Sequence, residues 1–433
     1  MGDRQQPRDR PGGGTGSIDP AAIDAGPIDE ELAAVVARVD SFVDATAGVG
    51  TTRSPDPSTD ETFQQLARDV VAITARLGAP YRRLCASRGL SNEDLRQLNW
   101  RRAPAVPVSA FRTVDLHLAP GREVFRSSGT TGGAAARSVH VHPFPDLYRR
   151  VIDASFPSAV LGASDSSRVA SDASPSARPP MLALVPSRQT VADSSLGFMV
   201  DHILRRFGGL GSTVAIGAGG VEQERAREFC RARRGDGRPA VILATAFALA
   251  QWLEGADRLD PLPAGSTVFE TGGFKGRHRE LERDELLRLI AGRVGVAPTR
   301  VVREYGMTEL TGHVYSRVLH GGDPDLFVPP AWMRVRALDP ATLEPVRPGE
   351  PGVLAIFDLA NVGSAVHVLS EDLGVLEGDG FRLLGRASDA ALRGCSLTAE
   401  ELAAGRERDR ARANIRGLPQ EPPSHDGYLD SPA

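Results

Sequence analysis

Short apolar runs alternate with helical patterns through the middle of the chain. Hydrophobic residues recur with helical spacing at 196–207, 223–234, 247–256 and 278–293. The runs between these helices have the length and composition of buried strands, and they lie at 181–185, 213–216, 241–244, 267–269 and 301–303. Strand and helix in alternation predict an α/β fold with a doubly wound, mostly parallel sheet.

The pattern changes on either side of this region. After Trp332, apolar runs follow one another without helical stretches between them, at 333–338, 353–357, 365–369 and 381–384. Such a series predicts a β-rich subdomain with mixed or antiparallel strands. Toward the start of the chain, 28–43 and 63–77 have the spacing of amphipathic helices.

Low-complexity stretches suggest where the folded part begins and ends. Residues 1–27 are rich in Gly, Pro, Arg and Asp, which predicts a disordered arm. We expect a large domain over 28–370, with a flexible Ser/Ala/Pro-rich insertion at 164–180, and a short, truncated C-terminal segment over 371–403. An Arg-rich and then Pro-rich tail covers 404–433, which we also expect to be disordered.

Composition and charge exclude several classes of protein. The 433 residues carry 51 basic and 55 acidic side chains, and the net charge of −4 argues against nucleic-acid binding. Three distant cysteines with no Cys-x-x-Cys pair exclude a disulfide scaffold and a cysteine zinc site. The most apolar window, 240–253, is too short for a membrane span. We therefore expect a cytoplasmic protein.

The first candidate for chemistry is a hydroxyl- and glycine-rich loop directly after the strand-like segment 123–126. Its backbone N–H groups and hydroxyls can point into one concavity, and glycine lets phosphate oxygens approach closely. An ordinary surface turn is the alternative interpretation. The loop consists of Ser127, Ser128, Gly129, Thr130, Thr131, Gly132 and Gly133.

A second candidate follows the strand-like segment 301–303, where doubly wound folds bind their ligands. Tyr305, followed by Gly306, could stack on a base, Thr308 could donate to a phosphate, and Glu309 could hold Mg²⁺, which prefers oxygen ligands. A helix start with Thr308 and Glu309 in capping roles is the alternative.

Two further turns carry an acid and a base. Asp372 could bind a ribose diol, and Arg386 could bridge ribose or phosphate. Each would be unremarkable alone, because acid and arginine turns are common on protein surfaces.

Taken in order, these motifs resemble the adenylate-forming superfamily of acyl-CoA synthetases, luciferases and peptide-synthetase adenylation domains. The loop 127–133 is similar to its phosphate loop, Gly272 and Gly273 to its adenine-contacting segment, and 305–309 to its Tyr-Gly-x-Thr-Glu motif. Asp372 resembles its ribose-binding acid, and Arg386 follows a glycine as in its hinge. Segments at 194–199, 271–275, 371–374 and 393–397 resemble the acyl-protein synthetases of bacterial luminescence, the LuxE type.

This resemblance implies an acid-thiol ligase that uses ATP and Mg²⁺. A carboxylic acid, expected to be a fatty acid, would be converted to acyl-AMP and passed to a cysteine, with an acyl reductase as partner. Thr308, Glu309, Arg386 and Cys395 would be catalytic, and Glu309 would hold the metal.

Cys395 matches the position of the family's acylated cysteine near the C-terminus. A nearby Arg393 and a capping pattern of Thr398 with Glu401 both favour a thiolate. A small apolar residue filling a turn is the alternative interpretation.

The chain also departs from the superfamily. The phosphate loop runs into three alanines and Arg137 instead of a lysine, and Lys275 is the only lysine in the chain. Adenylation could proceed without the superfamily's lysine, Arg393 or Lys275 could substitute for it, or the protein could have become a catalytically degenerate nucleotide-binding protein. An acyl-CoA or aryl-CoA ligase is the other alternative.

Three histidines need separate mention. His140 and His142 alternate along a strand and could face one ligand, but no acid or cysteine nearby favours a metal site. His313 could line the acyl pocket or be a hydrogen-bonded core residue.

Overall fold

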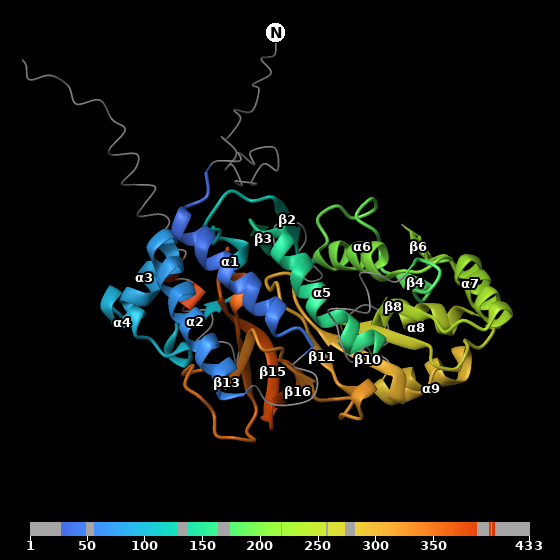
Figure 1. Ribbon diagram of the computed structural model, residues 1–433. Coiled ribbons are helices and arrows are strands. Elements are labelled where there is room, and N and C mark those ends of the chain that lie inside the picture. Colours follow the sequence, from blue (N-terminus) through green and yellow to red (C-terminus); the bar gives the residue numbers. More distant parts are fainter. Residues whose placement is uncertain are drawn as a thin grey trace, which may run out of the picture.

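The computed structural model describes residues 27–48, 56–128, 137–162, 174–217, 219–256, 259–272, 282–387, 398–399 and 401–402. Within them, one sheet of twelve strands runs through the molecule in the order β13-β14-β15-β16-β12-β11-β10-β9-β8-β4-β5, and β1 pairs with β15 (Figure 1). The described helices are α1 (Glu30–Ala45), α2 (Pro57–Leu77), α3 (Ala79–Ser87), α4 (Asn92–Arg96), α5 (Pro145–Leu161), α6 (Ser195–Phe207), α7 (Gln223–Asp236), α8 (Ala246–Gly255) and α9 (Arg283–Val294). None of them is both long and apolar enough to cross a bilayer.

Half of the large sheet is parallel. It consists of β5 (Thr213–Val214), β4 (Met181–Leu184), β8 (Val241–Thr245), β9 (Thr267–Thr271) and β10 (Val301–Tyr305). Adjacent β10 residues belong to different cores: Val302 packs with α5 and α6, whereas Val301 packs with α7, α8 and α9. Helices therefore bury both faces, which confirms the predicted doubly wound sheet.

One predicted strand is interrupted. The segment 213–216 pairs with β4 only through Thr213 and Val214. Ile216 pairs instead with Val221, in a separate hairpin of β6 (Ile216–Gly217) and β7 (Gly220–Val221). The apolar run is continuous, but the chain leaves the edge of the sheet within it, which hydrophobicity alone does not reveal.

The other half of the sheet is antiparallel, as the later apolar runs predict. It consists of β11 (Val314–Ser316), β12 (Phe327–Val328), β13 (Met333–Leu338), β14 (Gly352–Asp358), β15 (His367–Glu377) and β16 (Gly380–Arg386). It joins the parallel half directly, because Tyr305 of β10 pairs with Val314 of β11. The expected boundary between residues 370 and 371 falls inside β15.

Helices α1 to α4, at the blue end of the chain in Figure 1, lie beside the antiparallel half. An aromatic cluster joins them to the sheet: Phe63 of α2 and Trp100 both pack edge-on against Phe357 of β14, with ring centroids 5.8 and 5.9 Å away. A short strand, β1 (Val106–Pro107), then leads toward the hairpin of β2 (Glu123–Arg126) and β3 (Val139–His142). The observed strand β2 matches the predicted segment 123–126.

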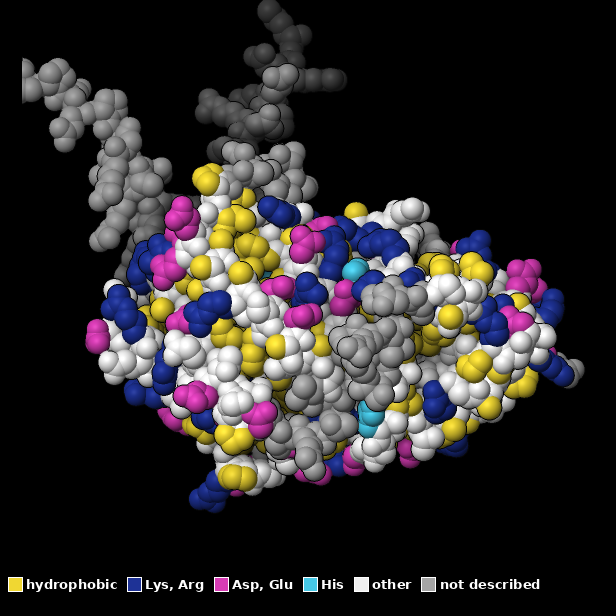
Figure 2. Space-filling model, in the orientation of Figure 1, with side chains coloured by type: hydrophobic (Ala, Val, Ile, Leu, Met, Phe, Trp, Pro, Cys, Tyr) yellow, Lys and Arg dark blue, Asp and Glu magenta, His cyan; other side chains and the backbone are white. Residues whose placement is uncertain are grey.

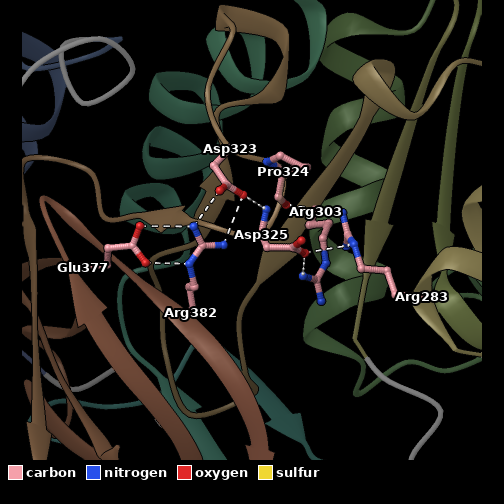
Figure 3. Close-up of polar contacts among 7 residues, drawn as sticks. All are labelled: Arg283, Arg303, Asp323, Pro324, Asp325, Glu377 and Arg382. Atoms are coloured by element: carbon pink, nitrogen blue, oxygen red, sulfur yellow. Dashed lines mark hydrogen bonds and ion pairs between the residues drawn. The ribbon is translucent and has the colours of Figure 1, made fainter. Parts of the chain in front are cut away.

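A network of ion pairs links the two halves of the sheet at one turn (Figure 3). Asp325 accepts from both Arg283 of α9 and Arg303 of β10, each at 2.9 Å. Two residues earlier, Asp323 pairs at 2.6 Å with Arg382 of β16, which also binds Glu377 of β15. This turn therefore ties a helix and strand of the parallel half to the β15–β16 hairpin. Elsewhere, acidic and basic side chains are interspersed over the face that Figure 2 shows.

Replacing Asp325 should destabilise the junction between the two halves. Burial and the neighbouring Arg303 lower the pKa of Arg283, whereas Asp325 counteracts them. Asp325→Ala leaves the two guanidinium groups close together without their shared partner, so we expect the free energy of unfolding to fall by about 1–2 kcal/mol. Denaturant titration measures this. Glu350→Ala, which removes an exposed pair with Arg347 at 4.0 Å, is the matched control and should change little. Equal effects of the two variants would contradict the structural role of the network.

Candidate functional site

The candidate site lies at the carboxyl ends of the parallel strands. Parallel strands end at the same edge, so the segments that follow β4, β9 and β10 meet there. Ser194 caps α6 by accepting from the Gly197 N–H at 2.9 Å, which starts that helix after β4. Ser195 then lies near Thr308, with 3.5 Å between the two hydroxyl oxygens.

The base of the predicted phosphate loop is an extension of the β2–β3 hairpin. The Ser127 N–H donates to the Ser138 carbonyl at 3.1 Å, and the Ser127 hydroxyl accepts from the Ser138 N–H at 2.9 Å. Arg137 donates to the Ser127 carbonyl and pairs with Asp193 at 3.3 Å. Ser127 and Arg137 thus close the loop, and Ser128 is exposed. Gly129, Thr130, Thr131 and Gly132 lie outside the described residues.

Tyr305, Asp372 and Arg386 come together across the two halves of the sheet. The Tyr305 hydroxyl donates to Asp372 Oδ2 at 2.9 Å, and Arg386 Nε lies 3.5 Å from Asp372 Oδ1. Asp372 and Arg386 are register partners on β15 and β16. The structure therefore gathers three predicted residues that are 67 and 14 positions apart in the chain.

The environment of Tyr305 differs from that of a freely accessible base-stacking ring. Its ring packs edge-on against Phe381 and Phe327, with centroids 5.3 and 6.0 Å away, and the residue is only 7% exposed. Burial, followed by the Asp372 charge, raises the pKa of the Tyr305 phenol, so the hydroxyl remains a donor to Asp372. In this conformation the hydroxyl rather than the ring face connects Tyr305 to the site.

Thr308 and Glu309 lie in the turn that joins β10 to β11. His140 donates through Nδ1 to the Thr308 carbonyl at 2.8 Å, and Asn361 donates to the Glu309 carbonyl at 2.9 Å. Glu309 itself is 4% exposed, and Thr308 is half-buried. The backbone of this turn is therefore held on both sides.

His142 extends the same support. Its Nε2 lies 2.9 Å from the Thr311 hydroxyl, which in turn donates to the Asn361 side chain at 2.7 Å. Because the single hydroxyl proton of Thr311 goes to Asn361, His142 must be the donor in the first bond. His140 and His142 thus position the turn of the candidate site. Their alternation on β3 was the available sequence signal; Asn361 gave none.

Gly306 lies where a side chain would collide with buried polar groups. A Cβ atom at this position would lie 2.3 Å from Glu304 Oε1 and 3.3 Å from His313 Nδ1. These two groups form a buried pair at 3.1 Å, and Thr271 also donates to the Glu304 carboxylate. Gly272 follows Thr271 with φ +70°, a backbone conformation that favours glycine. The ends of β9 and β10 are therefore joined through Glu304.

Part of the predicted site lies outside the described residues, namely Gly273, Lys275, Arg393 and Cys395. The chain beyond Cys395 is anchored on the N-terminal helices: Arg88, at the end of α3, donates to the Thr398 hydroxyl at 3.1 Å. The same arginine pairs with Glu401 at 3.4 Å. Among the described residues, no three His, Cys, Asp or Glu side chains form a metal-binding group.

Comparison with known families supports the sequence resemblance over the C-terminal part of the chain. Residues 258–403 match the family model "Acyl-protein synthetase, LuxE". A curated protein named long-chain-fatty-acid–luciferin-component ligase, from Vibrio harveyi, is 28% identical over 138 residues, which are 30% of this chain and 35% of that protein. A protein of the same name from Aliivibrio fischeri is 32% identical over 78 residues, 16% of this chain and 21% of that protein. The matches thus span about a third or less of these relatives' lengths.

Solved structures confirm the fold. A 2-hydroxyisobutyryl-CoA ligase in complex with 2-HIB-AMP superimposes with a TM-score of 0.55 at 15% identity, covering 77% of this chain and 69% of that one. An open conformation of this ligase, in complex with 2-HIB-AMP and CoA, covers 78% of this chain and 81% of that one with the same TM-score. The chain therefore has the fold of adenylate-forming ligases, as the motifs predict.

The histidines that support the turn should make its stability depend on pH. Burial lowers the pKa of His140 from 6.5 to about 4, so the folded protein keeps it neutral while the unfolded chain binds a proton below 6.5. Its contribution to stability is therefore complete above pH 6.5 and is lost as the pH falls toward 4, by up to about 1.4 kcal/mol per pH unit.

The test is His140→Asn, whose amide can still donate to the Thr308 carbonyl but does not titrate. We expect the variant to lose less stability than the parent protein between about pH 7 and pH 5, measured by denaturant titration. His117→Asn, at a partly exposed histidine, is the control. An unchanged slope in His140→Asn would contradict the neutral, donating state of His140.

Proposed function

We propose that this protein, whose residues 258–403 match the LuxE acyl-protein synthetases, activates a carboxylic acid with ATP and transfers the acyl group to a cysteine. The observation that carries the proposal is the meeting of Tyr305, Asp372 and Arg386 beside the Thr308–Glu309 turn, on an adenylate-forming fold. The names of the curated relatives suggest a long-chain fatty acid as the substrate class.

In the first half-reaction, a carboxylate oxygen forms a bond to the α-phosphorus of ATP, and the bond from that phosphorus to the pyrophosphate oxygen breaks. Asp372 would accept hydrogen bonds from the ribose hydroxyls, and the phosphate loop would bind the leaving phosphates. Thr308 and Arg386 would stabilise the charge that develops on the transferring phosphoryl group. Arg386 is well placed for this role, since its side chain is 69% exposed and swings from the end of β16.

The donor set around Glu309 fits a magnesium ion. Mg²⁺ is usually held by one or two carboxylates together with substrate phosphates, so it needs no complete protein cage. The Glu309 carboxylate and the Thr308 hydroxyl supply oxygen donors in one buried turn. The ion would neutralise phosphate charge, and the hydrogen bonds from His140 and Asn361 would keep the two residues in place.

In the second half-reaction, a thiolate attacks the acyl carbon of acyl-AMP, a carbon–sulfur bond forms and AMP leaves. Cys395 is our candidate for the acceptor, from its position in the family-like C-terminal segment. The other two cysteines are poor nucleophiles: burial raises the pKa of Cys85 and of Cys230 to about 12. The acyl group would then pass to an acyl reductase or another acceptor.

The proposal is tested by intact-protein mass spectrometry after incubation with Mg-ATP and a series of carboxylic acids. We expect a mass increase of one acyl group that hydroxylamine removes, that Cys395→Ser abolishes and that Cys230→Ala retains. Carboxylate-dependent pyrophosphate release without an adduct, together with acyl-CoA formation when CoA is added, would overturn the acyl-protein step and favour a CoA ligase. The absence of both products with every acid would overturn the enzymatic proposal and favour a degenerate nucleotide-binding protein.

The bond between Tyr305 and Asp372 gives a second prediction. Tyr305→Phe keeps the packed ring but removes the hydroxyl that orients the proposed ribose ligand. We expect the KM for ATP to rise about 3- to 10-fold, the range of one ordinary hydrogen bond, with a smaller change in kcat. Pyrophosphate release at varied ATP concentration measures this. Tyr81→Phe removes another buried hydroxyl, bonded to the Pro104 carbonyl, and should leave the KM for ATP unchanged. An equal rise in both variants would argue for a general loss of structure.

A further inference from the structure

A cavity lies on the side of β11 that faces α5. Its wall includes Ser155 of α5, His313 just before β11, and Tyr315 of that strand. Arg317 and Trp332 complete the polar part of the lining, with Val328 of β12 beside them. Aromatic and apolar atoms therefore form most of the wall, and several polar groups interrupt it.

Three of these polar groups have buried atoms that lack a hydrogen-bond partner in the described part of the chain. They are His313 Nε2, Arg317 Nε and Trp332 Nε1. His313 is 6% exposed and Trp332 is 1% exposed, so neither side chain has ready access to water. Buried polar groups in folded proteins are normally paired, and several unpaired ones around one cavity indicate a ligand that pairs them.

The His313 ring is held in a fixed orientation. Its Nδ1 faces the Glu304 carboxylate at 3.1 Å, and Tyr148 stacks on the ring with centroids 5.5 Å apart. The Nε2 atom is on the opposite edge of the ring. Burial and the nearby Glu304 charge raise the pKa of Tyr315, so its hydroxyl is also available as a donor. Arg317 and Trp332 supply N–H donors and no acceptors.

The cavity adjoins the proposed adenylation site through Gly306. A Cβ atom there would touch both Glu304 and His313, as described above, and the next residues are Met307 and Thr308. A carboxylic acid whose carboxylate lies at the Thr308–Glu309 turn would therefore extend toward the Glu304–His313 pair. The remainder of the acid, rather than its carboxylate, would meet the unpaired donors.

The geometry points to a substrate that carries a second oxygen group, a hydroxyl, ketone or carboxylate, on a short carbon chain. This inference rests on the proposed acid-activating function and narrows its substrate. An unsubstituted alkyl chain would bury the same donors without a partner, which sites of this kind disfavour strongly. The cavity thus selects an oxygen-substituted acid over the plain fatty acid that the relatives' names suggest.

The experiment compares pyrophosphate release with matched acids: butanoate, hexanoate and octanoate, their ω-hydroxy and ω-carboxy counterparts, and tetradecanoate. We expect at least one oxygen-substituted acid to have a kcat/KM about 10-fold or more above its unsubstituted partner and above tetradecanoate. Tyr315→Phe and Trp332→Phe remove one donor each while keeping an aromatic ring. Each should lower the preference for the oxygen group by about 2- to 10-fold with little change for the unsubstituted acid.

Trp252→Phe is the matched control, because Trp252 is also buried with an unpartnered Nε1 but lies in α8, away from the cavity. It should leave the preference unchanged. Activity that is highest with tetradecanoate would keep the proposed function and overturn the substrate inference. Should no acid release pyrophosphate, calorimetric titration of the same acids without ATP still decides: oxygen-dependent binding weakened by Tyr315→Phe supports the cavity's role, and equal or no binding of matched acids overturns it.

Discussion

The buried turn between β10 and β11 is the constraint on which the rest of the structure depends. At this turn the sheet changes from parallel to antiparallel, so the backbone must reverse direction inside the protein, where each polar group needs a partner. Asp358 meets part of that need by accepting from the Gly312 N–H at 2.6 Å. Gly312 has no room for a side chain, since a Cβ atom would lie 2.4 Å from the Met333 sulfur and 3.0 Å from Asp358.

The partners of this turn come from distant parts of the chain, and this links the site to the whole fold. The hairpin that carries the phosphate loop contributes His140 and His142, and the segment after β14 contributes Asn361. A single turn therefore fixes the relative positions of the proposed phosphate loop, Thr308 and Glu309. The same turn separates Tyr305, which faces Asp372, from the Glu304–His313 pair beside the cavity. Acid selection and nucleotide binding thus share one structural support.

Several features were predictable from the sequence because they depend on local periodicity. The strands at 181–185, 241–244 and 301–303 are apolar on both faces, as burial between two layers of helices requires, and the structure has strands there. The run at 213–216 shows the limit of this reasoning, because the chain turns away from the sheet after Val214 without any change in hydrophobicity. Likewise, Tyr305 could be assigned to the site from its motif, but its bond to Asp372 depends on strand pairing 67 residues away.

The sequence by itself determined the α/β class, the order of the chemical motifs and the resemblance to adenylate-forming enzymes, because these reside in spacing and side-chain type. Only the tertiary structure decided which polar groups meet. It turned His140 and His142 into supports of the Thr308–Glu309 turn, made Ser127 and Arg137 the base of the phosphate loop, and gathered unpaired donors around one cavity. The physical reason is that hydrogen bonds between buried groups are set by the register and packing of distant strands, which leave no periodic trace in the sequence.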